Sequence, residues 1–181
     1  MKLGLTALRA TLGAVFFAHG VQKLFGWFGG HGLHATAGAF ESMGLRPGRR
    51  TALIAGASEA GGGALLGLGL LTPLGSAAVI GVMDQAVRTV HLEKGFFVTN
   101  GGYEYNLTLV AAALVLADSG PGPFSLDEKL GLRMTGPLWA LAALGAGLAG
   151  PRLVERLAPP AEPEPPATPQ SAPEPVPATA A

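Results

Sequence analysis

The feature that most constrains the fold is an apolar stretch of membrane-spanning length with one charged residue near its middle. Residues 51–71 read TALIAGASEAGGGALLGLGLL, and Glu59 is the only charged side chain among them. About 20 apolar residues span the hydrocarbon core of a bilayer. A charge near the bilayer centre costs about 2.5–3.5 kcal/mol on insertion scales, so it normally faces a partner or a wet cavity. The stretch therefore predicts a membrane helix whose Glu59 points into a polar site.

Ionisable residues interrupt two further apolar stretches in the same way. Asp84 lies in the stretch that follows, and Arg9, His19 and Lys23 lie in the first stretch of the chain. Several such groups in one small chain indicate a polar site inside a helix bundle. Arg9 also breaks the first stretch, and no small-residue cleavage site follows before Lys23, so we interpret this stretch as a retained membrane helix and not as a secretory signal.

The composition agrees with a membrane protein and excludes some functions. Only 13% of the residues are charged, against about 25% in ordinary soluble domains. The mean hydropathy is +0.39. The formal net charge is zero, which gives no argument for nucleic acid, so the lipid bilayer is the partner that we expect. The chain has no cysteine, which excludes disulfides, thiol catalysis and cysteine-ligated iron–sulfur clusters within it.

Apolar stretches and turn signals predict an all-α integral membrane four-helix bundle. We expect its helices at residues 3–25, 51–71, 73–91 and 103–117, with a short helix on the membrane at 36–43. Residues 134–151 carry no charge, so they form either a fifth transmembrane helix or a tilted, interfacial one. The tail from Pro159 is rich in proline, alanine and glutamate and is expected to be disordered. The expected regions are therefore residues 1–133, 134–157 and 158–181.

Asp84, Arg88 and His91 are spaced i, i+4, i+7, so they share one face of the third predicted helix. Two interpretations stay open. The first is an ion pair near a helix end, with His91 among the lipid headgroups. The second is an inward polar stripe that binds a ligand, with Gln85 beside it to extend a hydrogen-bond network.

Glu59 shares a helix face with Gly56 and Gly63, and small residues at that spacing let another helix approach closely. One interpretation makes Glu59 a structural carboxylate that pairs with Arg9 or Arg88 across a helix contact. The other makes it a proton carrier, because burial and nearby charges tune the proton affinity of a carboxylate. The sequence does not rank these two roles.

The first predicted helix places Arg9, Gly20 and Lys23 within about 60° of one another, with His19 at the margin. Lys23 is expected to extend toward the membrane interface, and His19 to be a hydrogen-bonded core residue. Glu104 starts the fourth helix, where a carboxylate favours the helix dipole, and it lies opposite the other polar groups.

No metal site is predicted. His31 and His34 have the spacing of metal ligands, but they lie in a glycine-rich segment where Glu41 is the one nearby carboxylate. We also do not favour His19 and His91 as axial haem ligands.

The basic residues give an orientation that depends on the number of spans. With five spans, one side of the membrane carries Arg46, Arg49, Arg50, Lys94, Arg152 and Arg156. The other side carries Lys2, Lys129 and Arg133. The positive-inside rule then puts the first group in the cytoplasm. With four spans, the two sides become nearly equal.

Several of these segments together resemble the DoxX family of small bacterial membrane proteins. The stretch RATLGAVFFAHGVQKLFGWFGGHG (residues 9–32) is similar to the opening of that family. Glu59 with the glycine-rich helix and Leu-Thr-Pro at 71–73 fits its second and third helices. The segment GGYEYNLTLVAAALVLADSGPGPFSLDEKL (residues 101–130) resembles its fourth helix and ending. The fifth apolar segment and the proline-rich tail depart from the four-helix pattern.

The resemblance implies a multi-pass protein of the bacterial inner (plasma) membrane. It implies a membrane subunit of a quinone-linked redox or oxidative-stress system, with partner oxidoreductase subunits and a quinone as its cofactor. Two alternatives stay open: a small proton-coupled or solute transporter, and a non-catalytic scaffold that docks partners through Gly56, Ala60 and Gly63. The sequence assigns no catalytic residue. The candidate proton donors are Glu59, His19 and Glu104, and the candidate binding residues are Arg9, Lys23, Asp84, Arg88 and His91.

Overall fold

The computed structural model describes residues 3–157, and these residues form helices and no β-strand. The α-helices are α1 (Leu3–Phe25), α2 (Gly32–Ser42), α3 (Gly48–Leu68), α4 (Thr72–Ala86), α5 (Glu104–Ser119), α6 (Leu126–Lys129) and α7 (Pro137–Leu157). Shorter helical turns are η1 (Trp27–Gly29), η3 (Leu92–Lys94) and η4 (Val98–Asn100). The segment η2 (Val87–His91) continues α4 as a π-helix.

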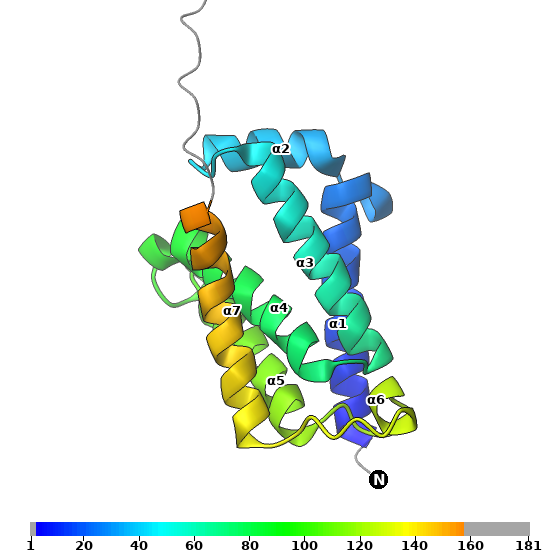
Figure 1. Cartoon of the computed structure of the whole chain (residues 1–181). Helices are drawn as coiled ribbons and strands as arrows, with labels where there is room; N and C mark the ends of the chain where they lie inside the picture. The colour runs from blue at the N-terminus through cyan, green and yellow to red at the C-terminus, as the bar shows by residue number, and fades with distance from the viewer. Residues whose placement is uncertain (1–2, 158–181) are drawn as a thin grey trace, which may run out of the picture.

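Helices α1, α3, α4 and α5 form a four-helix bundle, as the sequence predicts. Neighbouring helices of this set pack on one another, and α7 packs on α4 and α5 (Figure 1). Helix α2 lies across one end of the bundle, and α6 lies at the opposite end, near the N-terminus of α1 (Figure 1). The core holds fully buried aliphatic side chains from three of the bundle helices, Leu66, Ile80 and Leu116.

The boundaries of the predicted helices are largely correct. The first runs over residues 3–25 as expected. The second begins and ends three residues earlier than predicted. Its end is set by Gly69, whose left-handed conformation (φ 62°) terminates α3. The uncharged segment at 134–151 lies in α7, which extends to Leu157 and contains Pro151. The predicted tail at 158–181 lies outside the described residues.

Glycine lets α1 and α3 approach closely. A Cβ added at Gly20 would overlap the backbone of Ala60, and one added at Gly63 would overlap the backbone of Phe17. The small residues of α3 therefore pack against α1 of the same chain. The prediction that Gly56, Ala60 and Gly63 form a free docking surface is wrong, because α1 covers Gly56 and Gly63, and the backbone of Ala60 lies against Gly20.

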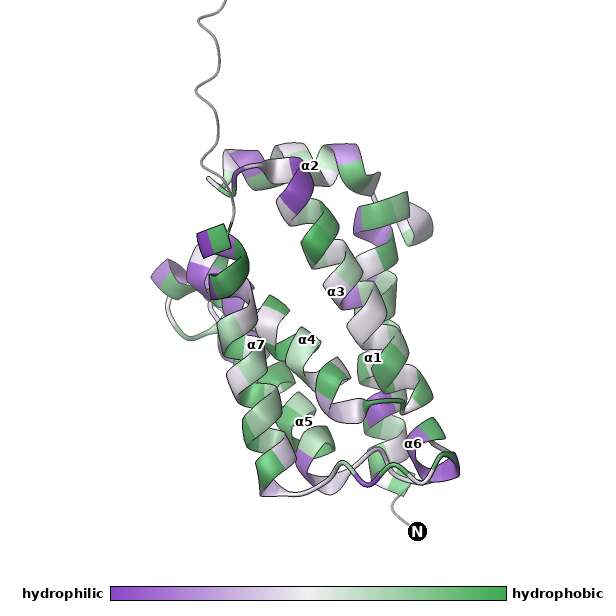
Figure 2. Cartoon of the chain, in the orientation of Figure 1, coloured by the Kyte–Doolittle hydropathy of each residue, from purple (hydrophilic) through white to green (hydrophobic). Residues whose placement is uncertain are grey.

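The outer surface of the bundle suits a bilayer. Three helices, α1, α3 and α7, are long and apolar enough to cross a membrane. Large apolar side chains such as Leu107, Leu138 and Leu141 point outward and are more than half exposed. Figure 2 shows apolar residues along the lengths of the helices, while hydrophilic residues gather toward the two ends of the bundle. The protein is an all-α integral membrane protein.

Candidate functional site

An ion pair between α1 and α3 forms the polar centre of the candidate site. Lys23 Nζ lies 2.5 Å from Glu59 Oε2. The Glu59 residue is 5% exposed, and 24% of the Lys23 side chain is exposed. The approach of the two helices at Gly20 places Lys23, in the last turn of α1, beside the middle of α3. Lys23 thus balances the charge of Glu59 within the bundle.

This pairing corrects two predictions. The partner of Glu59 is Lys23, and neither Arg9 nor Arg88 forms an ion pair with it in the described part of the chain. Arg9 lies 14 residues before Lys23 on α1, or about 21 Å along the helix at 1.5 Å per residue. Lys23 was expected to extend to the membrane interface, but its ammonium points inward because Glu59 provides a close counter-charge.

A cavity of about 880 Å³ lies beside this ion pair, between α3, α4 and α7. Its walls are mostly apolar, with Ile54, Leu65 and Val82 among the lining side chains. Lys23 and Glu59 contribute to the lining, and the connection between α2 and α3 borders the cavity at one end. The site therefore combines a long apolar space with one paired carboxylate and ammonium.

Arg9 is almost fully buried and is held by backbone carbonyl groups at the opposite end of the bundle. Its Nε donates to the carbonyl of Pro121 at 2.8 Å, and Nη1 donates to that of Gly67 at 2.7 Å. Its Nη2 donates to the carbonyls of Pro123 and Phe124. These bonds fix the connection after α5 against α1 and α3, so Arg9 has a structural role here and does not line the large cavity.

Asp127 is a buried structural residue that the sequence analysis missed. Its carboxylate accepts hydrogen bonds from the backbone N–H of Leu71 at 2.7 Å and from that of Thr72 at 3.1 Å. It also accepts from Thr72 Oγ1 at 2.7 Å. The carboxylate satisfies the first N–H groups of α4, which otherwise lack partners inside the helix. Ser125 and Glu128 show the S-x-x-E signal of a helix start, but nothing local indicates that Asp127 reaches α4.

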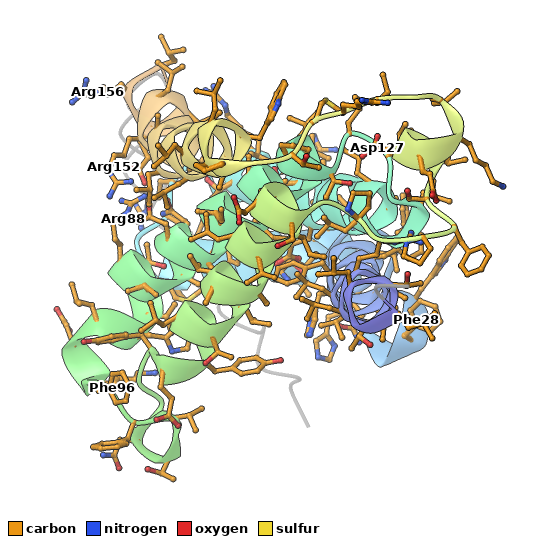
Figure 3. The ribbon with its side chains drawn as sticks, turned by 90° about the horizontal axis from the view of Figure 1, so that it is seen from below. Phe28, Arg88, Phe96, Asp127, Arg152 and Arg156 are labelled. Carbon is orange, nitrogen blue, oxygen red and sulfur yellow. The ribbon has the colours of Figure 1, made fainter. Side chains whose placement is uncertain are left out.

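An ionic cluster joins the end of α4 to α7. Asp84 accepts from Arg88 Nε at 3.0 Å and from Arg152 Nη1 at 2.8 Å, while Arg88 Nη1 lies 3.2 Å from Glu155. Gln85 accepts from Arg88 Nη2 at 2.6 Å, as the polar-network interpretation expects. Figure 3 shows Arg88 and Arg152 on one flank of the bundle, away from Asp127. These contacts hold α7 against α4.

The remaining predicted site residues do not contact the Lys23–Glu59 pair. His91 Nδ1 lies 2.6 Å from the carbonyl of Gly101, because the π-helical segment turns it toward the α4–α5 connection. His19 was expected to be a hydrogen-bonded core residue, and this prediction is wrong because His19 is exposed on the outer face of α1. Glu104 starts α5 as predicted, and its side chain makes no hydrogen bond within the described residues. Its neighbour Tyr103 lines a separate cavity of about 240 Å³.

Comparison with known proteins identifies one family. Residues 4–92 match the family model described as DoxX. No curated protein and no solved structure gives a significant match. The matched segment contains both members of the Lys23–Glu59 pair, whereas α5 and α7 lie outside it. Residues 3–157 hold no group of three or more histidine and acidic side chains that could bind a metal ion.

Proposed function

Because the chain belongs to the DoxX family, we propose that it is a membrane subunit of a quinone-linked redox or oxidative-stress system. The observation that carries this proposal is the cavity of about 880 Å³ with the Lys23–Glu59 pair in its wall. Ligand pockets typically enclose about 300–1,000 Å³ and combine mostly apolar walls with a few polar groups. A quinone needs such a space for its ring and tail.

The paired side chains suit the polar end of a quinone. Glu59 can give or take a proton at a carbonyl oxygen of the ring, and the Lys23 ammonium can donate a hydrogen bond to an oxygen that gains negative charge. Most of the cavity wall is apolar, and charge interactions are stronger beside apolar groups than in bulk water. The chain has no cysteine for a thiol-ligated redox centre, so electrons come from a partner oxidoreductase subunit or directly from a reduced substrate.

The arrangement of the helices supports a multi-pass protein of the bacterial inner membrane with five crossings. In Figure 1 the α2 region and the C-terminal end of α7 lie toward one end, and α6 and the start of α1 lie at the other. Arg46, Arg50 and Arg152 belong to the first end, which the positive-inside rule assigns to the cytoplasm. Residues 1–133 then form the four-helix domain, and residues 134–157 add the fifth span.

Binding of a quinone analogue to the purified protein tests this proposal. Gly61 lines the cavity and has open space for a larger side chain, so Gly61→Leu is expected to fill part of the cavity and to weaken binding at least about tenfold. Gly67 lies on the same helix with similar open space but does not line the cavity. Gly67→Leu is therefore the matched control and should bind normally.

Two results would overturn the redox role. One is a protein that binds no quinone analogue and co-purifies with no oxidoreductase. The other is equal analogue binding by the Gly61→Leu and Gly67→Leu variants.

A small proton-coupled or solute transporter is the second candidate, because the same buried pair borders an open cavity. Substrate-dependent flux into proteoliposomes, lost in Glu59→Gln, would favour it. A scaffold subunit would show partner assembly without flux or quinone binding.

A further inference from the structure

The cavity carries a net positive charge at one end. Its charged lining residues are Lys23, Arg46, Arg50, Glu59 and Glu155. Lys23 pairs with Glu59, and Glu155 pairs with Arg88 from outside the lining. Within residues 3–157, Arg46 and Arg50 have no ion pair and donate no side-chain hydrogen bond. The cavity thus offers two cations that form no ion pair with a described residue of the chain.

These two cations lie where a lipid headgroup would lie. Arg46 is in the α2–α3 connection, and Arg50 is in the first turn of α3. Glu41 Oε1 accepts a hydrogen bond from the backbone N–H of Gly48, the first residue of α3, at 3.1 Å. Because this carboxylate offsets the helix dipole, the positive potential at this end comes from Arg46 and Arg50. Trp27 and Phe28 are exposed in the segment just before α2, as is typical of aromatic residues at a membrane interface.

The part of the cavity between Arg50 and Glu59 has about the depth of one leaflet of a bilayer, and the lining continues along α3 to Leu65. Glu59 follows Arg50 by nine residues on α3, which is about 14 Å at 1.5 Å per residue. Half of the hydrocarbon core is about 15 Å. The apolar part of the cavity between these two levels can therefore hold an acyl chain of the same leaflet.

The cavity also lies beside the hydrocarbon. Two of its walls, α3 and α7, are helices of membrane-spanning length and apolarity. The main contacts of α7 are with α4 and α5, and α3 packs mainly on α1, α4 and α2. No substantial α3–α7 contact separates the cavity from the bilayer, so an acyl chain can enter from the side.

We propose that this cavity binds a membrane phospholipid with an anionic headgroup. Arg46 and Arg50 hold the phosphate-bearing headgroup, and one acyl chain runs along the apolar wall toward the level of Glu59. The inference does not depend on the quinone proposal. If both ligands bind, they compete for the same apolar space.

The experiment measures headgroup preference in the full-length protein without added quinone. The purified chain is placed in nanodiscs or detergent with phosphatidylglycerol or phosphatidylcholine, and bound lipid is counted by native mass spectrometry. Phosphatidylglycerol is expected to bind preferentially. Arg46→Gln combined with Arg50→Gln should reduce that preference about 25-fold, because each basic residue near an anionic surface contributes roughly fivefold.

Arg49→Gln is the matched control. Arg49 lies between the two positions in sequence, is exposed and does not line the cavity, so its substitution should leave the preference within about twofold. All three arginines are outside the bundle core, and thermal melting checks that each variant folds. Arg46→Lys with Arg50→Lys should keep most of the preference, because the charge is retained.

Three outcomes overturn the proposal. The first is equal binding of the two lipids by the unaltered protein. The second is an equal loss of preference in Arg49→Gln and in the double variant, which would indicate general surface attraction. The third is a preference that appears only after residues 158–181 are removed, which would mean that the acidic tail of the chain holds the two cations. A quinone analogue that fails to bind leaves these results unaffected.

Discussion

Replacing Glu59 by glutamine should destabilise the protein through the lysine that it leaves behind. The substitution keeps the size of the side chain but removes the counter-charge that lies 2.5 Å from Lys23 Nζ. Breaking a buried ion pair by removing one partner costs about 3–5 kcal/mol. Because 24% of the Lys23 side chain is exposed, we expect the lower end, about 3 kcal/mol.

A double-mutant cycle separates this effect from a general loss of packing. Lys23→Met alone leaves the buried Glu59 carboxylate unpaired, so it should also destabilise by about 3 kcal/mol or more. The double variant leaves no unpaired charge and should lose only about 1 kcal/mol. The coupling free energy between the two positions is then about 5 kcal/mol, which is larger than the roughly 0.5–3 kcal/mol usual for residues in direct contact.

The assay is reversible unfolding of the purified protein in mixed micelles, supported by the abundance of each variant in membranes. Arg9→Gln and Arg88→Gln serve as second-site controls. Neither should rescue Glu59→Gln, because Arg9 is held by backbone carbonyls and Arg88 by Asp84 and Glu155. A Glu59→Gln variant of normal stability would refute the structural ion pair and would favour a neutral proton carrier. Rescue by Arg9→Gln would refute the assignment of Lys23 as the partner.

Three further predictions concern the contacts that shape the bundle. Asp127→Asn should lower the free energy of unfolding by about 1–3 kcal/mol, because the amide cannot accept all three hydrogen bonds from Leu71 and Thr72. Glu128→Gln, at an exposed position, is the control, and a loss of thermal stability in Asp127→Asn no larger than in this control would contradict the structural role of Asp127. Gly20→Leu should prevent folding, since any Cβ at this position overlaps the backbone of Ala60. Recovery of the variant from membranes in normal amounts would refute the close packing of α1 on α3. Arg152→Ala should lower the free energy of unfolding by only about 0–1 kcal/mol, because the Arg152 side chain is 45% exposed. A loss above about 2 kcal/mol in thermal or chemical unfolding would show that the ionic cluster stabilises the protein more than its exposure implies.

The amino-acid sequence alone was sufficient to predict a bundle of membrane helices. Hydrophobic stretches of spanning length are a property of consecutive residues, so the bounds of α1 and the existence of α7 could be predicted without tertiary information. The Asp84–Arg88 pair was predictable for the same reason, because helix geometry alone brings residues four apart together. The presence of a charge in the middle of α3 also indicated a partner or a polar cavity around Glu59.

The partner of Glu59 and the position of the cavity depend on how the helices pack in three dimensions. The rotation of α1 against α3 depends on the glycine contacts at Gly13 and Gly20, and a helix turns by about 100° with each residue. That rotation places Lys23 beside Glu59 and places Arg9 beside the carbonyl groups that follow α5. Asp127 could not be found locally, because its partners at residues 71 and 72 lie more than 50 positions away in the chain. Partner choice between distant residues depends on helix packing, which no local pattern in the sequence specifies.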